Sequence, residues 1–205
     1  DGGSNSHSAS ATVTVVDNIN PTITAPTGVT VNVDADACST ALSNVTLGTP
    51  TTGDNCSVAS TTNDAPVSFP LGATTVTWTV TDGSGNTATS TQVVTVVDNI
   101  APVAVAQNIT VQLDANGQAT ITTADVDNGS SDNCTFTLSL DQTSFDCDDL
   151  GANTVTLTAT DGSSNTHSVT ATVTVVDNID PVAVAQNITV QLDANGQASI
   201  TTADV

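Results

Sequence analysis

Residues 75–86 read TVTWTVTDGSGN, and residues 154–165 read TVTLTATDGSSN. In both stretches apolar residues alternate with threonine, which is the two-residue period of a strand with one buried face. A turn of Asp, Gly, Ser and Asn follows each alternating run. The two stretches therefore predict long amphipathic strands that end in tight turns. Trp78 aligns with Leu157 and is expected in the core, together with the other inward positions: Val76, Val80, Val155 and Ala159.

The strand and its turn recur because the chain repeats itself about every 80 residues. The motif Val-Asp-Asn-Ile occurs at residues 16–19, 97–100 and 176–179, with spacings of 81 and 79 residues. Such a chain is expected to be a section of a longer array. The spacings predict the end of one repeat at 1–17, whole repeats at 18–98 and 99–177, and the start of another at 178–205.

Composition favours an all-β fold. The chain has no Lys, Arg, Glu or Met, so most strong helix formers are missing, and Thr and Val dominate. Six or seven short strands per repeat predict an immunoglobulin-like β-sandwich. Asp114-Ala115-Asn116-Gly117 is typical of a β-hairpin turn, because Asn-Gly tolerates positive φ angles. We expect tandem sandwiches in an extended head-to-tail array.

The charge of the chain limits its partners. The formal net charge is −21, and all the acidic residues are aspartate. Nucleic acid is excluded as a natural partner, because phosphate binding needs cationic side chains. Without Lys or Arg to pair with, each aspartate must be solvated, hydrogen-bonded in a turn or bound to a metal ion.

Recurring Asp and Asn positions predict calcium sites where repeats meet. The last strand of a repeat, at roughly 3.3 Å per residue, separates the Asp-Gly-x-x-Asn turn from the Val-Asp-Asn-Ile link. In a head-to-tail array each turn is then expected to approach the link of the preceding repeat. Carboxylate and amide oxygens suit Ca²⁺, although an Asx-type turn is the simpler interpretation. The candidate ligands are Asp17, Asn18, Asp54, Asp82, Asn86, Asp98, Asn99, Asp132, Asp161, Asn165 and Asp177, with Asp125 and Asp127 as further candidates.

The cysteines fall two in each whole repeat. We predict the disulfides Cys38–Cys56 and Cys134–Cys147, both within a repeat, which indicate an oxidising compartment. A zinc site is the alternative, but the sequence has no Cys-x-x-Cys and no clustered His.

Asp54-Asn55-Cys56 and Phe69-Pro70-Leu71-Gly72 form a pattern with residues 75–86 and 94–98. This pattern resembles the hyalin-repeat (HYR) module, an immunoglobulin-like domain found in tandem in extracellular proteins. Residues 147–151 depart from it at the Phe-Pro position. That variant resembles repeat arrays of Bacteroidetes surface proteins, including gliding-motility adhesins exported by the type IX route. The Asp-Asn-x-x-Pro link also resembles the calcium-binding linkers of cadherins. The resemblance implies adhesion or cell-surface architecture and carries over no catalytic residue.

The leading functional hypothesis is a non-enzymatic stalk or filament of a large extracellular, cell-surface adhesin. Its partners would be neighbouring repeats of the same chain, other copies in a filament, and surface glycans or a substratum bound through regions outside this chain. His7 and His167 occupy equivalent positions without a Ser or Cys partner in a motif, so no catalytic residue is predicted. An accessory region of a secreted enzyme is one alternative. A carbohydrate- or ice-binding surface is another, formed by the outward rows Thr75, Thr77, Thr79, Thr81 and Thr154, Thr156, Thr158, Thr160.

Overall fold

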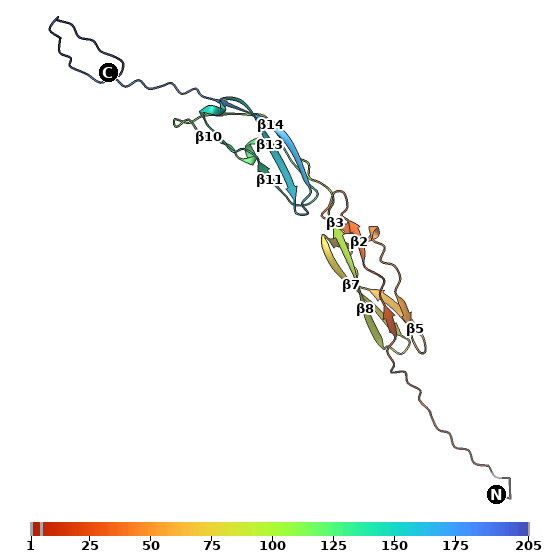
Figure 1. Cartoon of the computed structure of the whole chain (residues 1–205). Helices are drawn as coiled ribbons and strands as arrows, with labels where there is room; N and C mark the ends of the chain where they lie inside the picture. The colour runs from red at the N-terminus through yellow and green to blue at the C-terminus, as the bar shows by residue number, and fades with distance from the viewer. Residues whose placement is uncertain (1, 5, 205) are drawn as a thin grey trace. The chain divides into compact units, whose positions relative to one another are not determined.

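The computed structural model describes residues 2–4 and 6–204, so Asp1, Asn5 and Val205 of the predicted partial repeats lie outside it. The chain divides into two compact units (Figure 1). One unit contains residues 1–104, 129–139 and 158–168, and the other contains residues 105–128, 140–157 and 169–205. The repeat boundaries at residues 98 and 177 stay a prediction. No helix in the described part of the chain is long and apolar enough to cross a membrane.

The long alternating strands form the centres of two four-stranded sheets. In the first, strand order is β2-β8-β7-β5. Strands β7 and β8 pair antiparallel from Gly72↔Val96 to Thr81↔Thr87, and β2 runs parallel to β8. The predicted all-β class is confirmed. The strands of this sheet are β2 (Val29–Asn32), β5 (Val58–Asn63), β7 (Gly72–Asp82) and β8 (Thr87–Val97).

Two small sheets pack on this four-stranded sheet. One pairs β1 with β4, and the other pairs β3 with β6. The core between the layers contains Phe69, Val76, Trp78, Val94 and Val96, with Ile23 of β1 packed against it, which is the arrangement of a β-sandwich. The bounds are β1 (Thr22–Thr24), β3 (Ser39–Ala41), a 3₁₀ turn (Leu42–Asn44), β4 (Thr51–Gly53) and β6 (Ser68–Pro70).

Residues 109–176 contain a second four-stranded sheet, with order β11-β13-β14-β9. Its predicted inward residues Val155, Leu157 and Ala159 are fully buried. A two-stranded sheet pairs β10 with β12. The bounds are β9 (Ile109–Gln112), β10 (Ala119–Thr120), α1 (Thr123–Val126), β11 (Phe136–Leu140), β12 (Ser144–Phe145), a 3₁₀ turn (Cys147–Asp149), β13 (Gly151–Asp161) and β14 (Thr166–Val176).

The predicted hairpin at Asp114–Gly117 is half right. The turn forms, with Asp114 N–H donating to Gln118 O at 2.8 Å and Gly117 at a φ of 74°. However, β9 pairs in parallel with β14, whereas β10 pairs with β12. The strands that flank the turn therefore enter different sheets.

The departure of the second repeat from the Phe-Pro pattern is an insertion. Phe69 is buried on β6 opposite Thr40, and Phe145 is buried on β12 opposite Ala119. Phe145 therefore takes the core position of Phe69. The 3₁₀ turn Cys147–Asp149 is extra chain between that aromatic residue and β13.

The predicted cysteine pairing is wrong. The structure joins Cys38 to Cys134, with 4.8 Å between their Cα atoms, and leaves Cys56 and Cys147 free and exposed. Cys38 follows β2, whose Asn32 is paired with Val97 at the end of β8. Cys56 precedes β5, whose Val58 is paired with Asp82, just before β8 begins. The two cysteines thus lie at opposite ends of a sheet about 30 Å long, too far apart for a disulfide.

Candidate cation sites at the Asp-Asn links

Three loops bring carboxylates together at the start of the first sandwich. They are the link before β1, the loop between β4 and β5, and the turn between β7 and β8. They contribute Asp17, Asp54 and Asp82, each with one carboxylate oxygen within 4.8 Å of the others. Asp82 is buried, and the other two carboxylates are half-buried. We call this group the first acidic cluster.

Asn86 fastens the turn to the link. Its Nδ2 donates to Asp17 O at 3.1 Å, to Ile19 O at 3.4 Å and to Asp82 Oδ2 at 2.7 Å. Asp82 Oδ1 in turn accepts from the backbone N–H groups of Ser84 and Asn86. The Asx-type interpretation is therefore correct for Asp82, whose two oxygens both hold the turn together.

The same contacts recur at the next link. Asn165 Nδ2 donates to Asp98 O at 3.2 Å, to Ile100 O at 3.4 Å and to Asp161 Oδ2 at 2.8 Å. The predicted approach of each turn to the link before it is thus confirmed. Here Asp98, Asp132 and Cys134 offer ligand atoms within 4.8 Å of one another. Because the Cys134 sulfur belongs to the disulfide, the second acidic cluster consists of Asp98 and Asp132.

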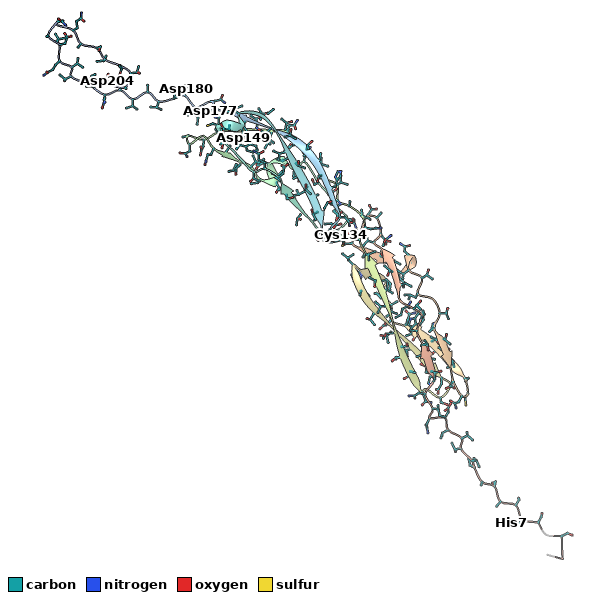
Figure 2. The ribbon with its side chains drawn as sticks, in the orientation of Figure 1. His7, Cys134, Asp149, Asp177, Asp180 and Asp204 are labelled. Atoms are coloured by element: carbon teal, nitrogen blue, oxygen red, sulfur yellow. A yellow bond between two sulfur atoms is a disulfide. The ribbon has the colours of Figure 1, made fainter. Side chains whose placement is uncertain are left out.

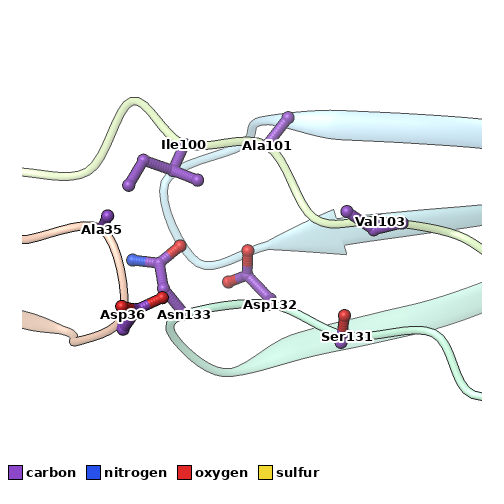
Figure 3. Close-up of a pocket in the computed structure, with 8 residues that line it drawn as sticks. All are labelled: Ala35, Asp36, Ile100, Ala101, Val103, Ser131, Asp132 and Asn133. Atoms are coloured by element: carbon purple, nitrogen blue, oxygen red, sulfur yellow. The ribbon is translucent and has the colours of Figure 1, made fainter.

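Several oxygens of these clusters are buried without a hydrogen-bond donor. Asp98 is only 8% exposed; its Oδ1 accepts from Ile100 N–H at 3.0 Å, and its Oδ2 has no partner. The Oδ1 atoms of Asp54 and Asp132 are also unpartnered. Figure 3 shows the carboxylate of Asp132 directed toward the link segment at Ile100 and Ala101. A buried carboxylate oxygen is costly unless a donor or a cation satisfies it.

Asparagine side chains complete the surroundings of both clusters. Asn55 Nδ2 donates to Asp17 Oδ1 at 3.3 Å. Asn133 Nδ2 donates to Ala37 O at 3.4 Å, and Asn133 Oδ1 is buried without a partner. Asn133 and Asp132 both line a cavity of about 410 Å³ beside Ile100. The sequence signal for these two asparagines is their place in the repeated Asp-Asn-Cys motif.

The other predicted ligands are not members of the two clusters. Asn18 and Asn99 are exposed. Asp177 is exposed (Figure 2), and its Oδ1 accepts from Ile179 N–H at 3.0 Å. Asp125 caps the short helix α1 by accepting from the N–H and hydroxyl groups of Thr122. Asp127, at the end of that helix, donates its own N–H to Thr123 O.

Hydrogen bonding shifts the pKa values of the turn aspartates. The pKa of Asp82 is lowered, chiefly by the side-chain donor of Asn86. Burial raises the pKa of Asp161, but the donors of Asn165 and neighbouring backbone groups outweigh it, and the net pKa is lowered. In contrast, the pKa of the Cys56 thiol is raised, first by its hydrogen bond with Asp17 and then by the charge of that carboxylate. Both turn carboxylates are therefore ionised at neutral pH, and the Cys56 thiol is protonated.

Replacing Asn86 with alanine is expected to raise the pKa of Asp82 toward its ordinary value in calcium-free buffer. A carboxylate with a lowered folded-state pKa stabilises the fold above its unfolded pKa of about 3.9, and this contribution is lost as pH falls through the folded-state pKa. Asn86→Ala should therefore unfold at a higher pH in an acid titration, with the Asp82 carboxyl carbon followed by NMR. Ser84→Ala is the control, because it keeps the backbone N–H that Asp82 accepts. An unchanged Asp82 titration in Asn86→Ala would contradict this account.

The histidine at position 167 has a structural contact. Its Nδ1 accepts the backbone N–H of Ala104 at 2.9 Å. His7 is exposed in the segment before the first strand. The contact of His167 fits the structural interpretation of its recurring position.

Residues 16–96 match the family model described as HYR domain, which supports a hyalin-repeat module over this part of the chain. No curated protein matches the chain. Among solved structures it is similar to human mucin-like protocadherin EC1-2, at 14% identity and a TM-score of 0.41, over 77% of this chain and 98% of that one. It is also similar to human protocadherin-24 EC1-2, at 12% identity and a TM-score of 0.37, over 79% and 100% of the two chains. A likeness at this level carries no conclusion about function.

Proposed function

We propose that this chain is a structural section, a stalk or filament, of a large cell-surface adhesin, and that calcium stiffens the joints between its repeats. The match of residues 16–96 to the HYR domain supports an extracellular, adhesion-type module without enzymatic activity. The repetition of whole sandwiches along the chain supports a spacer, since each repeat adds length and presents the same surface again. The adhesive region then lies elsewhere in the protein, and it binds surface glycans or a substratum.

The observation that carries the calcium proposal is the pair of acidic clusters with buried, unpartnered oxygens at equivalent links. The chain has no Lys or Arg to neutralise them. Calcium binds six to eight hard oxygen ligands, and carboxylate, amide and backbone carbonyl oxygens are all present at the links. A bound cation would relieve the repulsion between the clustered carboxylates and resist bending of the link. Asp17, Asp54 and Asp82 would hold one ion, and Asp98 and Asp132 another.

Calcium titration of the purified chain should show heat from two sites by calorimetry, one for each cluster. At free calcium about 100 times Kd, each site stabilises the fold by about 2.7 kcal/mol, which raises Tm on the order of 10 °C. A chelator should reverse the shift. The absence of both calcium uptake and a thermal shift would overturn the calcium proposal.

Asp98→Asn should remove one of the two binding events. In calcium it is expected to lower Tm, whereas in chelator it should leave Tm unchanged or raise it, because one repelling charge is gone. Asp148→Asn is the matched control, since Asp148 is exposed in the 3₁₀ turn and belongs to neither cluster. If Asp98→Asn changes Tm by the same amount in calcium and in chelator, Asp98 acts without a cation.

The adhesive role is tested by locating the binding activity. We expect the chain itself to bind no ligand on a glycan array, and the alternating threonine rows to act only as strand residues. Attachment of whole cells should be lost when the protein is deleted. It should be kept when the number of repeats is reduced without removing the adhesive region. Saturable binding of a glycan to this chain would favour the carbohydrate-binding alternative instead.

A further inference from the structure

The Cys38–Cys134 bond links two kinds of position that every whole repeat contains. Cys38 lies in the turn that follows β2, within the first predicted repeat. Cys134 belongs to the Asp-Asn-Cys loop before β11, within the second. We call a cysteine at the first position a turn cysteine and one at the second position a loop cysteine. Because the two positions lie at opposite ends of a repeat, the turn cysteine of one repeat can bond the loop cysteine of the next repeat.

Cys56 has the same surroundings as the bonded Cys134. Asp54 Oδ2 accepts from Cys56 N–H at 2.9 Å, and Asp132 Oδ2 accepts from Cys134 N–H at 3.0 Å. The preceding asparagine Nδ2 lies 3.5 Å from the sulfur in both loops. Cys56 is exposed. It is therefore a loop cysteine held in the geometry of a bonded one, with its sulfur accessible to another chain segment.

Cys147 lies beside the turn that corresponds to the turn of Cys38, although it comes from a different part of the sequence. The turn after β9 matches the turn after β2: Gly117 N–H donates to Asp114 O at 2.9 Å, as Ala37 N–H donates to Asp34 O at 3.1 Å. Cys38 directly follows Ala37, whereas residue 118 is glutamine. The inserted 3₁₀ turn brings the Cys147 sulfur to 3.9 Å from Gly117 O. A Cβ on Gly117 would lie 2.8 Å from that sulfur, so glycine leaves the space for it.

We propose that Cys147 forms a disulfide with the Asp-Asn-Cys cysteine of a repeat that follows residue 177, and that Cys56 bonds the turn cysteine of a repeat that precedes residue 18. The Cys38–Cys134 bond is then one copy of a cross-link present at every junction. In each bond, two thiols give up two protons and two electrons. The oxidant is a small-molecule or protein disulfide, which is reduced to two thiols.

This inference rests on the proposed array of repeats, but it does not depend on calcium. Continuous covalent links would hold successive repeats at a second point besides the Val-Asp-Asn-Ile segment. Two attachments at each joint restrict rotation more than one does. The array would therefore resist bending and pulling even after calcium is removed.

The test extends the chain by one repeat. Residues 178–205 repeat residues 99–126 with two changes, so a second copy of residues 127–205 placed after Val205 completes the repeat. The protein is oxidised with glutathione disulfide in chelator, its thiols are alkylated, and its peptides are mapped by mass spectrometry. We expect Cys147 bonded to Cys134 of the added copy, with Cys38–Cys134 retained. Two alkylated thiols should then remain, Cys56 and the added Cys147. Four alkylated thiols in a protein that keeps Cys38–Cys134 would overturn the proposal.

Two variants sharpen the result. Cys147→Ser combined with Ser144→Cys moves the thiol three residues toward the N-terminus, to the exposed position 144. The added Cys134 should then stay free.

A second tandem chain joins residues 1–177 to residues 18–205 and tests Cys56. There Cys147 of the first part should bond Cys56 of the second, and free thiols at both positions would refute the inference. This second chain decides the question if the first extension does not fold. Neither result alters the calcium titration, so failure here is distinguishable from failure of the calcium proposal.

Discussion

Replacing Gln92 with leucine is expected to lower the free energy of unfolding of the first sandwich by about 3 kcal/mol or more. Gln92 is buried in the core side of β8. Its Oε1 accepts from Trp78 Nε1 at 3.1 Å, and its Nε2 donates to Thr27 O at 2.8 Å and Leu47 O at 2.9 Å. Leucine fills similar space but cannot form these hydrogen bonds. The N–H donor of Trp78 and the carbonyl acceptors of Thr27 and Leu47 would then lack this partner. Each such buried group costs about 1–3 kcal/mol.

Urea unfolding followed by tryptophan fluorescence measures this loss, because Trp78 is the only tryptophan and lies in the affected core. The urea midpoint should fall without a change in the m-value. Thr91→Ala is the matched control, since Thr91 is the exposed neighbour of Gln92 on the same strand. It should change stability by less than about 0.5 kcal/mol. A loss below about 1 kcal/mol for Gln92→Leu would show that the network contributes little.

Replacing Phe69 with alanine is expected to destabilise the same sandwich by about 3–5 kcal/mol, the usual cost of emptying an aromatic site in a core. Phe69 is fully buried and packs in the cluster with Val76 and Trp78. Because the short strand β6 is held by Phe69 and its pairing with β3, the small sheet should loosen with it. The same urea experiment measures the effect.

Val67→Ala is the control for Phe69→Ala. Val67 is two residues away and 86% exposed, so its truncation should leave the midpoint nearly unchanged. Phe145→Ala should cause a similar loss in the second sandwich, where Phe145 is buried on β12. That loss requires a probe other than Trp78, such as circular dichroism. If Phe69→Ala and Val67→Ala unfold at the same urea midpoint, the Phe69 side chain does not stabilise the core.

Alternation alone was enough to predict the long strands and their buried faces. Threonine at every second position over seven residues leaves one strand register that buries apolar side chains, so Val76, Trp78 and Val80 were placed correctly. Alternation did not predict the buried position of Gln92. A glutamine at an inward position has no apolar signal, and its partners Thr27 and Leu47 come from distant loops. The equivalent position on β14 is Ala171, and Leu157 stands in place of Trp78, so the two sheets differ in how they fill this part of the core.

The acidic sites were partly predictable for a similar reason. Recurrence of the Asp-Asn links and turns indicated which residues matter, and the length of the intervening strand indicated that a turn meets the preceding link. Which oxygens remain available depended on local backbone geometry. Asp82 and Asp161 use their oxygens to hold their own turns, whereas Asp54, Asp98 and Asp132 keep one oxygen unpartnered.

The sequence by itself determined the all-β class, the period of about 80 residues and the strands that carry the core, because these follow from alternation, composition and repetition. Only the tertiary structure decided the cysteine pairing. Spacing along the chain favoured partners within a repeat, but long strands separate those cysteines by the length of a sheet. Cys38 instead meets Cys134, which is 96 residues away along the chain. A disulfide depends on distance in space, and in this protein the cysteines that are close in space are those the sequence assigned to different predicted repeats.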